Sequence, residues 1–381
     1  MRAVVLCHTA ELSLVVLRAL RANGVEPFVA CEARIERVLT SSRACAGLLL
    51  AGDLGRKQRD LIDAVNGLHR KAGVDIVMAC NVQGLRILHE ISPELPAPIY
   101  PMPPLDALDV LDDKIKFYDL ALRLGVAVPR SMAFESAETI DVGQVSRELG
   151  YPAAVKPTIS WGSIGFRRIG SEAELVHLVA DRSYAFRHLV VQEYVEGDDV
   201  GAGLFVRHGR VQAMATFRCG PRDAAEFISI PPLATAAERV VTATGCEGVI
   251  NFDARLTPAG ELRLLECNPR FFMRLRAARL CGLDLLGMGL PAFGGSPGKA
   301  RGHYRPLGDV ASALGLRQLL TGKWSTDVLV RTAAEAAADP LAILLGRLGS
   351  GRTRRPPPEP YSVGGNPPAA KYSAPRASSD A

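Results

Sequence analysis

Residues 251–270 read NFDARLTPAGELRLLECNPR, and this stretch decides how the rest of the chain is interpreted. Its two ends have the composition of β-strands, and residues 257–260 (TPAG) between them predict a hairpin turn. Side chains alternate between the two faces of a strand, so Glu266 and Asn268 point the same way. If the numbers of opposed residues add to an odd value, Asp253 lies on that face as well.

Two carboxylates and an amide oxygen would then converge within a few ångströms on one face of the hairpin. Hard oxygen ligands of this kind suit Mg²⁺ that is held jointly with the phosphates of a substrate. The alternative is an ordinary hairpin whose polar residues lie on its solvent-exposed face. The remaining motifs of the chain bear on this choice.

Composition limits the classes of function. The 381 residues are 48% hydrophobic, enough to bury a sizeable core in two or three domains. The net charge is +5, but residues from Arg347 onward carry +4 of it, so the remainder is near +1. A body with so little net charge is not expected to bind nucleic acid.

The eight cysteines contain no Cys-x-x-Cys pair, and the seven histidines show no metal-ligand spacing. This usage predicts reduced, buried thiols in a cytoplasmic protein. Residues 1–24 could be taken for a signal peptide, but Glu11 and Arg18 interrupt the apolar run and no convincing cleavage site follows. No uncharged apolar run is long enough for a membrane span, so no membrane partner is expected.

The first hundred residues alternate between strand and helix patterns. Strands are predicted at 3–8, 26–31 and 75–79, and helices at 11–23 and 56–72. This alternation predicts a small doubly wound α/β domain with a parallel sheet. The turn after the first strand lacks Gly-x-Gly-x-x-Gly, so a dinucleotide site is not expected there.

A proline cluster at 93–104 predicts a linker to a second unit. Asp112 is predicted to cap a helix that runs to about Leu124. A strand then carries Lys156, and a helix at 171–182 precedes another strand.

A third unit extends from Gly197 to about Gly295 and contains the hairpin. Residues 307–348 have apolar rows that predict helices. The tail from Gly349 is rich in Pro, Gly and Ser and is predicted to be disordered.

Lys156 ends an apolar strand directly before a loop that contains glycines and serines. These loop residues are Ser160, Gly162, Ser163 and Gly165. Glycines let a backbone approach phosphate oxygens, serine hydroxyls donate to them, and lysine supplies a positive charge. The alternative is a solvated surface loop. The acidic stretch 192–199 that follows could expose backbone groups to an adenine edge, or could be a surface turn.

In their order along the chain, these motifs resemble the ATP-grasp superfamily, within it the carbamoyl-phosphate-synthase-like enzymes and carboxylate–amine ligases. The resemblance covers about residues 1–295, and its most specific motif is 266–270 (ECNPR). It implies an α/β and α+β chain with the ATP-grasp fold, an N-terminal doubly wound α/β (pre-ATP-grasp) domain and a C-terminal helical extension. The expected divisions are 1–105 for the N-terminal domain, 106–195 and 196–300 for the two ATP-grasp subdomains, 301–348 for the extension and 349–381 for the tail.

The resemblance also implies roles for single residues. Lys114 and Lys156 would hold the α- and β-phosphates of ATP, beneath a flexible lid formed by the loop 158–165. Asp253, Glu266 and Asn268 match the ligands of two Mg²⁺ ions, for which Mn²⁺ is the substitute. The remaining matches are Gln192, Glu193 and the backbone of Val195 for adenine, Asp199 for ribose, and Arg270 for the transition state that forms an acyl phosphate.

Three positions stay open. Arg218 is either a further phosphate- or substrate-contacting cation or an exposed arginine at a strand end. The lid carries Ile159, Trp161 and Ile164 where relatives often have glycine. After Arg270 the chain has bulky residues, of which the phenylalanines are expected to pack and the arginines are left unassigned; they are Phe271, Phe272, Arg274 and Arg276.

The chemistry implied by the resemblance is ATP-dependent ligation. A carboxylate would attack the γ-phosphorus, and an amine would take the resulting acyl phosphate, with release of ADP and phosphate. The alternatives are an enzyme that carbamoylates or carboxylates with bicarbonate, and a nucleotide-binding module without catalysis. The expected partners are ATP and small carboxylate and amine substrates, and a homodimer is left open.

Overall fold

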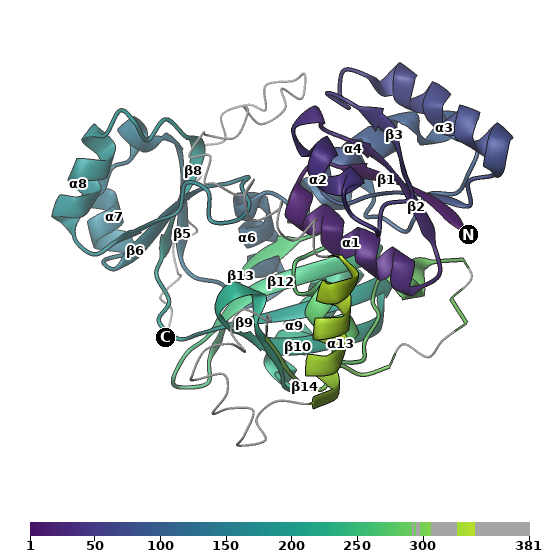
Figure 1. Ribbon diagram of the computed structural model, residues 1–381. Coiled ribbons are helices and arrows are strands. Elements are labelled where there is room, and N and C mark those ends of the chain that lie inside the picture. The colour runs from purple at the N-terminus through teal and green to yellow at the C-terminus, as the bar shows by residue number, and fades with distance from the viewer. Residues whose placement is uncertain (292, 295–297, 306–325, 340–381) are drawn as a thin grey trace.

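The structure is a computed structural model that describes residues 1–291, 293–294, 298–305 and 326–339. In these ranges the chain forms three β-sheets in succession, with helices packed on them (Figure 1). Short 3₁₀ turns connect some elements; they are η1 (Ala33–Ile35), η2 (Ser92–Glu94), η3 (Ala137–Thr139), η4 (Pro221–Asp223) and η5 (Gly287–Gly289). No helix in the described ranges combines the length and the apolar character needed to cross a membrane.

The first sheet is parallel, with strand order β3-β2-β1-β4. Its elements are β1 (Arg2–Cys7), α1 (Ala10–Ala22), β2 (Glu26–Cys31), α2 (Glu36–Thr40), β3 (Gly47–Ala51), α3 (Gln58–Ala72), β4 (Ile76–Ala79) and α4 (Val82–Ile91). Every residue of β1 from Ala3 to Cys7 is fully buried, because helices cover both faces. The doubly wound prediction is confirmed, and β3, α2 and α4 add to it.

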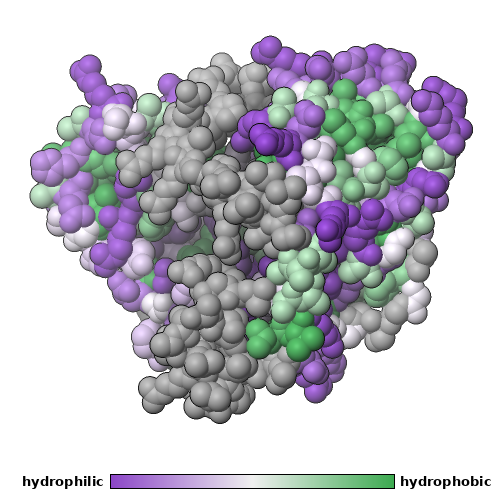
Figure 2. All heavy atoms as spheres, in the orientation of Figure 1, coloured by the Kyte–Doolittle hydropathy of each residue, from purple (hydrophilic) through white to green (hydrophobic). Residues whose placement is uncertain are grey.

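The strand order of this sheet reverses at β1, and such a reversal often marks a ligand site. The chain steps outward from β1 to β2 and β3, then returns to place β4 on the other side of β1. Ligands of such sheets bind where the strand order reverses, at the carboxyl ends of the strands. His8 and Asn81 follow β1 and β4 at this point. The outer side of α3, at the upper right, is largely hydrophilic (Figure 2).

The second sheet is antiparallel, with order β5-β8-β6-β7. It is preceded by α5 (Leu105–Leu111) and α6 (Lys114–Arg123) and consists of β5 (Ser131–Ser136), α7 (Val142–Glu148), β6 (Ala153–Pro157), β7 (Arg167–Ile169), α8 (Glu172–Ala180) and β8 (Arg187–Glu193). Val155 and Val191 pack with α7 and α8 in one core. Lys156 therefore lies on the opposite face of the sheet.

The predicted cap of α6 is corrected by one residue. Asp113, not Asp112, is the N-cap, because its carboxylate accepts hydrogen bonds from the backbone N–H groups of Ile115 (2.9 Å) and Lys116 (3.1 Å). Asp112 instead ends α5 and is buried beside the start of α6.

The third sheet is antiparallel, with order β13-β12-β9-β10-β11-β14. Its elements are β9 (Asp198–Arg207), β10 (Arg210–Cys219), β11 (Ala225–Phe227), α9 (Pro231–Thr244), β12 (Gly248–Leu256), β13 (Leu262–Asn268), α10 (Leu275–Leu280) and β14 (Gly302–Tyr304). One face packs against α6 and α9. The other shares a continuous core with α1 and α10, so the first and third units form one body (Figure 1).

A β-bulge sets the register of the predicted hairpin. Near the turn Ala254 pairs with Leu264, but beyond the bulge Asp253 pairs with Glu266 and Asn251 with Asn268. Without the extra residue, Asp253 would face Leu265 and the two carboxylates would lie on opposite faces. Asp253 and Glu266 are therefore opposed with residue numbers that add to an odd value, as the sequence analysis required for both carboxylates to share one face.

The described part of the C-terminal region is helix α13 (Thr326–Ala338), which contacts α10 and β14. Residues 302–304 were expected in the helical extension but form β14. The rest of the predicted helical stretch, 306–325 and 340–348, and the predicted tail 349–381 lie outside the described residues.

Asp339 anchors the end of α13 to the N-terminal unit. Its carboxylate lies 2.8 Å from Arg18 Nη2 and accepts hydrogen bonds from Ser42 Oγ (2.6 Å) and the Arg43 backbone N–H (3.1 Å). Asp339 is buried, and burial alone would raise its pKa, but the bonds from Ser42 and Arg18 outweigh burial and lower it.

We expect Asp339→Asn to lower the free energy of unfolding at pH 7 by about 3–5 kcal/mol, because it leaves Arg18 buried without its counter-charge. A carboxylate with a lowered folded pKa stabilises the fold above its unfolded pKa and ceases to do so as pH falls through the folded pKa. The difference from wild type should therefore shrink below about pH 4. Urea denaturation at pH 7 and pH 3 measures it, with exposed Asp327→Asn in the same helix as control. Equal stability of Asp339→Asn and wild type at pH 7 would contradict the anchor.

Candidate functional site

Four polar residues share one face of the β12–β13 hairpin. Asp253 and Glu266 are directly opposed, and Asn251 and Asn268 form the next pair on that face. Asn251 Nδ2 donates to Asp253 Oδ1 (3.1 Å), and Asn268 Nδ2 donates to Asp253 Oδ2 (2.9 Å). The predicted set of Asp253, Glu266 and Asn268 is thus brought together.

The two carboxylates have opposite pKa shifts. Burial and then the negative charge of Glu266 raise the pKa of Asp253 to about 6. Burial also opposes ionisation of Glu266, but the positive charges of Lys114 and Lys156 outweigh burial and lower its pKa. Glu266 is therefore the more strongly ionised member of the pair, and a bound cation would favour ionisation of both.

Two lysines from different elements face Glu266. Lys114 begins α6, and its Nζ lies 3.5 Å from Glu266 Oε2 and donates to the backbone oxygen of Ser160 (3.2 Å). Lys156 projects from the face of the second sheet opposite α7 and α8, where burial lowers its pKa to about 8 and Glu266 partly opposes that shift. The site therefore lies between the second and third sheets, with positive charge on one side and negative charge on the other.

Arg270 follows the hairpin and orders it further. Its Nη2 donates to Asn268 Oδ1 (2.9 Å), and its Nη1 donates to the backbone oxygen of Phe271 (2.9 Å). Burial raises the pKa of the nearby Asp112, while Lys114 and Arg270 act against that shift. Asp112 is thus a buried counter-charge to both cations.

Two glycines and a serine of the loop after Lys156 adopt left-handed backbone conformations. Gly162, Ser163 and Gly165 have φ values of +60°, +60° and +77°. A Cβ on Gly165 would lie 2.7 Å from Pro157 Cδ, so a side chain has no room there. Ser160 Oγ lies 3.5 Å from Lys114 Nζ, which joins the loop to the start of α6.

Large apolar side chains on this loop are exposed. Ile159, Trp161 and Phe166 are each between 37% and 38% exposed although they are bulky. Apolar groups held in water at the edge of a polar site are suited to cover a ligand. The unusual bulk of this loop is therefore compatible with a lid.

The acidic stretch is only partly directed at the site. Gln192 is buried on the same face as Lys156, and its Nε2 donates to Ser131 Oγ (2.8 Å). Glu193 points to the other face and pairs with Arg130 (3.1 Å), so its side chain is directed away from Lys156, and a contact to adenine through its backbone stays a prediction. Val195 follows β8 in irregular backbone, which leaves its backbone groups outside the sheet ladder.

Asp199 lies on the same face of the third sheet as Asp253. It is opposed to Arg255, and Arg255 Nε lies 3.0 Å from its Oδ1. A ribose hydroxyl would therefore compete with Arg255 for this carboxylate.

Arg218 is not brought to the carboxylates. In the sheet it aligns with Val200 and Ala254, whereas its neighbour Phe217 aligns with Gly201 and Asp253. Its side chain thus lies on the opposite face, where it pairs with Asp198 (2.9 Å) and Glu226 (3.0 Å). The structure supports the alternative of a strand-end arginine and not a phosphate contact.

The bulky residues after Arg270 divide as follows. Phe271 and Phe272 are buried in the core, as expected, and a Cβ on Gly203 would lie 2.4 Å from Phe272 Cζ. Arg274 donates to the backbone oxygens of Gly220 (3.2 Å) and Ala224 (3.3 Å), and its positive charge partly opposes the rise in the pKa of Asp253. Arg276 turns toward α13 and pairs with Glu335 (3.3 Å).

Asn251 was missed as a site residue. Its Oδ1 is buried on the acidic face and has no hydrogen-bond partner in the part of the chain that the structure describes. A buried polar atom without a partner costs free energy unless a ligand or ion completes its bonding. Alternation along β12 would have placed Asn251 beside Asp253, so the signal was present in the sequence.

The donor set fits divalent magnesium. It combines two carboxylates with two amide oxygens and contains no sulfur or imidazole. Among the described residues no three His, Cys, Asp or Glu side chains cluster around one point. A cation here would therefore need further oxygens from phosphate groups or water, as Mg²⁺ commonly does.

Two family models match the chain. One, described as "ATP-grasp in the biosynthetic pathway with Ter operon", matches residues 185–312, and one described as "D-ala D-ala ligase C-terminus" matches residues 120–228. Together these matches include every lysine, carboxylate and amide of the site except Lys114.

Part of the chain is similar in sequence to curated proteins. It is 26% identical over 178 residues to the arginine-specific large chain of carbamoyl phosphate synthase from Bacillus subtilis, covering 43% of this chain and 17% of that protein. It is 27% identical over 198 residues to D-alanine–D-alanine ligase from Xanthomonas axonopodis, covering 45% and 61%. The chain thus spans less than two thirds of the length of either relative.

A solved structure shares the fold. The biotin carboxylase domain dimer of 2-oxoglutarate carboxylase from Hydrogenobacter thermophilus, in complex with MgADP, ADP and bicarbonate, superimposes with a TM-score of 0.61 at 15% identity. The match covers 79% of this chain and 73% of that one. At this identity the likeness establishes the fold.

Proposed function

This chain belongs to the ATP-grasp superfamily, and we propose that it is an ATP-dependent ligase that joins a carboxylate to an amine. The observation that carries the proposal is the opposition of Asp253 and Glu266 to Lys114 and Lys156 across two sheets. Such a site matches the alternating charges of a magnesium-bound triphosphate.

In the proposed reaction a carboxylate oxygen of the substrate attacks the γ-phosphorus of ATP. A new P–O bond forms as the bond to the bridging oxygen of ADP breaks. The amine nitrogen then attacks the acyl carbon, phosphate leaves with the C–O bond electrons, and the nitrogen loses a proton to give an amide. Two Mg²⁺ ions, or Mn²⁺ in their place, would neutralise phosphate charge during transfer.

The residues of the chain supply position and charge. Lys114 and Lys156 are assigned to the phosphates, and Asp253, Glu266, Asn268 and Asn251 to the metal ions. Arg270 is assigned to the transferring phosphoryl group, where a fixed charge favours the transition state. The loop 158–165, with its exposed Trp161, is assigned to the exclusion of water.

The acceptor pocket is proposed between Arg270 and the first sheet. Arg270 and Ala79, the last residue of β4, line one small cavity with Tyr100. The carboxyl end of β4 reaches it at Ala79, and in the sheet β4 lies beside β1, which His8 follows. His8 is buried, and its Nδ1 has no hydrogen-bond partner among the described residues. A polar group of a substrate that extends to the carboxyl end of β1 would supply one.

Further parts of the proposal concern setting and assembly. All eight cysteines are free, which suits a reducing cytoplasm. Small carboxylates and amines are the proposed substrates, and a homodimer is the proposed assembly, as the related biotin carboxylase domain was solved as a dimer.

Magnesium should increase the affinity for ATP at least about tenfold, since two buried carboxylates otherwise repel the triphosphate. Calorimetric titration of the full chain with ATP, with Mg²⁺ and with EDTA, measures this difference. Absent binding, or equal affinity in both conditions, would contradict the site. ADP release across a panel of carboxylates and amines, with bicarbonate included, then identifies the substrates by mass spectrometry.

A further inference from the structure

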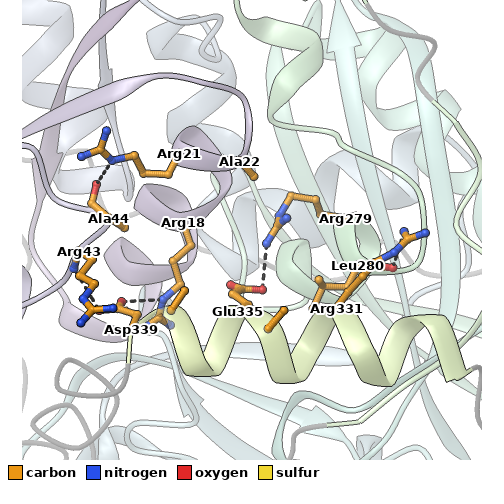
Figure 3. A pocket seen from close by; sticks show the side chains of 12 residues that line it. Arg18, Arg21, Ala22, Arg43, Ala44, Arg279, Leu280, Arg331, Glu335 and Asp339 are labelled. Carbon is orange, nitrogen blue, oxygen red and sulfur yellow. Dashed lines mark hydrogen bonds and ion pairs between the residues drawn. The ribbon is translucent and has the colours of Figure 1, made fainter.

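A second cavity, of about 500 Å³, lies where α1 and the turn after α2 meet α10 and α13 (Figure 3). Its volume is in the range of sites for small molecules. Five arginines line it, namely Arg18, Arg21, Arg43, Arg279 and Arg331. None of its lining residues belongs to the nucleotide site described above.

Two carboxylates, one in α13 and one on the residue directly after it, neutralise part of this charge. Asp339 pairs with Arg18 (2.8 Å), and Glu335 pairs with Arg279 (3.0 Å). The side chains of the other three arginines have no carboxylate partner within the part of the chain that the structure describes. The lining therefore carries a net charge of +3.

The three remaining guanidinium groups keep most of their donors. Arg21 Nε donates to the Ala44 backbone oxygen (3.1 Å), and Arg331 Nη1 makes a long contact with the Leu280 oxygen (3.4 Å). The Arg43 side chain makes no hydrogen bond or ion pair in the described ranges. Nearby, Arg279 Nε is buried without a hydrogen-bond partner.

This arrangement favours a bound anion. Arg21, Arg43 and Arg331 are exposed, so water reaches their free donors, but like charges around one cavity repel one another and raise the positive potential there. The buried donor of the lining without a partner among the described residues is Arg279 Nε, which adds to the cost of the empty cavity. Guanidinium groups match the paired oxygens of phosphate and carboxylate groups better than any other side chain does.

We propose that this cavity binds a small oxyanion of two or more negative charges, either a phosphate ester or a polycarboxylate. Figure 3 shows Arg21 and Arg43 on the side of the N-terminal unit and Arg331 on α13. The Arg331 guanidinium points toward Leu280 (Figure 3), so an anion would contact both sides once this exposed side chain turns toward α1, and it would then tie α13 to α1. The proposal does not depend on the ligase activity.

The test uses the full chain without ATP or Mg²⁺. Inorganic phosphate, pyrophosphate and citrate are titrated by calorimetry and by thermal unfolding against chloride of equal ionic strength. At least one probe should bind and raise the melting temperature, because a ligand of the folded state stabilises it. Tighter binding of pyrophosphate than of citrate indicates a phosphate ester, and the reverse order indicates a polycarboxylate.

Variants locate the bound anion. Arg43→Gln with Arg331→Gln should weaken binding at least about tenfold, since two charge-assisted contacts are lost. The control is Arg70→Gln with Arg147→Gln, which removes the same charge from exposed positions of α3 and α7 and should leave the affinity within about twofold. Lys156→Met should also retain binding, because it alters only the nucleotide site.

Three results would overturn the proposal. They are a dissociation constant above about 10 mM for every probe, binding that Lys156→Met abolishes and the double variant retains, and equal weakening by the double variant and its control. If the double variant does not fold, Arg43→Gln alone carries the test, because that side chain makes no hydrogen bond or ion pair with the described residues. Retained affinity in folded Arg43→Gln would then refute the role of Arg43.

Discussion

Replacing Glu266 with Gln is expected to lower kcat by about 10³-fold or more, a loss of about 4 kcal/mol of transition-state stabilisation. Gln keeps the shape of the side chain but removes the ionised partner of Asp253. It also removes the negative charge that lies 3.5 Å from Lys114 Nζ. Any Mg²⁺ at the hairpin would lose a charged ligand at the moment when phosphate charge redistributes.

The measurement is steady-state ADP release with the substrate pair that the panel identifies. Calorimetry of the same variant should show that Mg²⁺ no longer strengthens ATP binding. Glu261→Gln is the matched control, because it lies on the same hairpin but is exposed and pairs only with Arg263 at the surface. If Glu266→Gln is as active as Glu261→Gln while folded, the acidic face of the hairpin is structural.

The acidic hairpin was largely predictable because alternation along a strand is a local property. Glu266 and Asn268 share a face in any strand, and the TPAG turn indicated the hairpin. The relation of Asp253 to Glu266 was not predictable, because it depends on a bulge of one residue. Nothing in the apolar and polar pattern of 262–266 marks the extra residue, so the register stayed conditional.

The structure separates residues between which the sequence left a choice. Asp112 and Asp113 are equally good caps by composition, and only their positions at the junction of α5 and α6 separate them. Gln192 and Glu193 were assigned one role although adjacent strand residues point to opposite faces. Arg218 lay on a correctly predicted strand, but its face depended on pairing with β9, a contact between distant residues.

The arginine cavity could not be predicted from local sequence patterns. Its charged residues extend from Arg18 to Asp339, and no local spacing relates them. They meet because α1 and α10 share a core with the third sheet while Asp339 fixes α13 beside them. Charged side chains that the sequence pattern would place on separate solvent-exposed helix faces thus line one cavity in the structure.

Replacing Arg270 with Met is expected to lower kcat by roughly 10²–10³-fold, about 3–4 kcal/mol, with a far smaller change in ATP affinity. Met keeps much of the length and removes the charge. Arg270 also holds Asn268 through its Oδ1 and offsets the buried charge of Asp112. A loss caused only by misplacement of Asn268 must therefore be separated from a loss of transition-state charge.

Arg270→Lys makes that separation. Lysine keeps a positive charge but lacks the fork that bonds Asn268 and the Phe271 oxygen together. If charge at the transferring phosphoryl group matters most, Arg270→Lys should recover a substantial part of the kcat lost in Arg270→Met. If positioning of Asn268 matters most, both variants should be equally slow and both should lose the effect of Mg²⁺ on ATP binding.

Arg218→Met is the matched control for both variants, since it removes an arginine from the opposite face of the same sheet. It should leave kcat within about twofold, because exposed ion pairs contribute little. Strongly weakened ATP binding with preserved kcat in Arg270→Met would make Arg270 a ground-state nucleotide contact. An interaction that acts mainly in the transition state cannot give that result, because its removal slows turnover and leaves the bound ground state nearly unchanged.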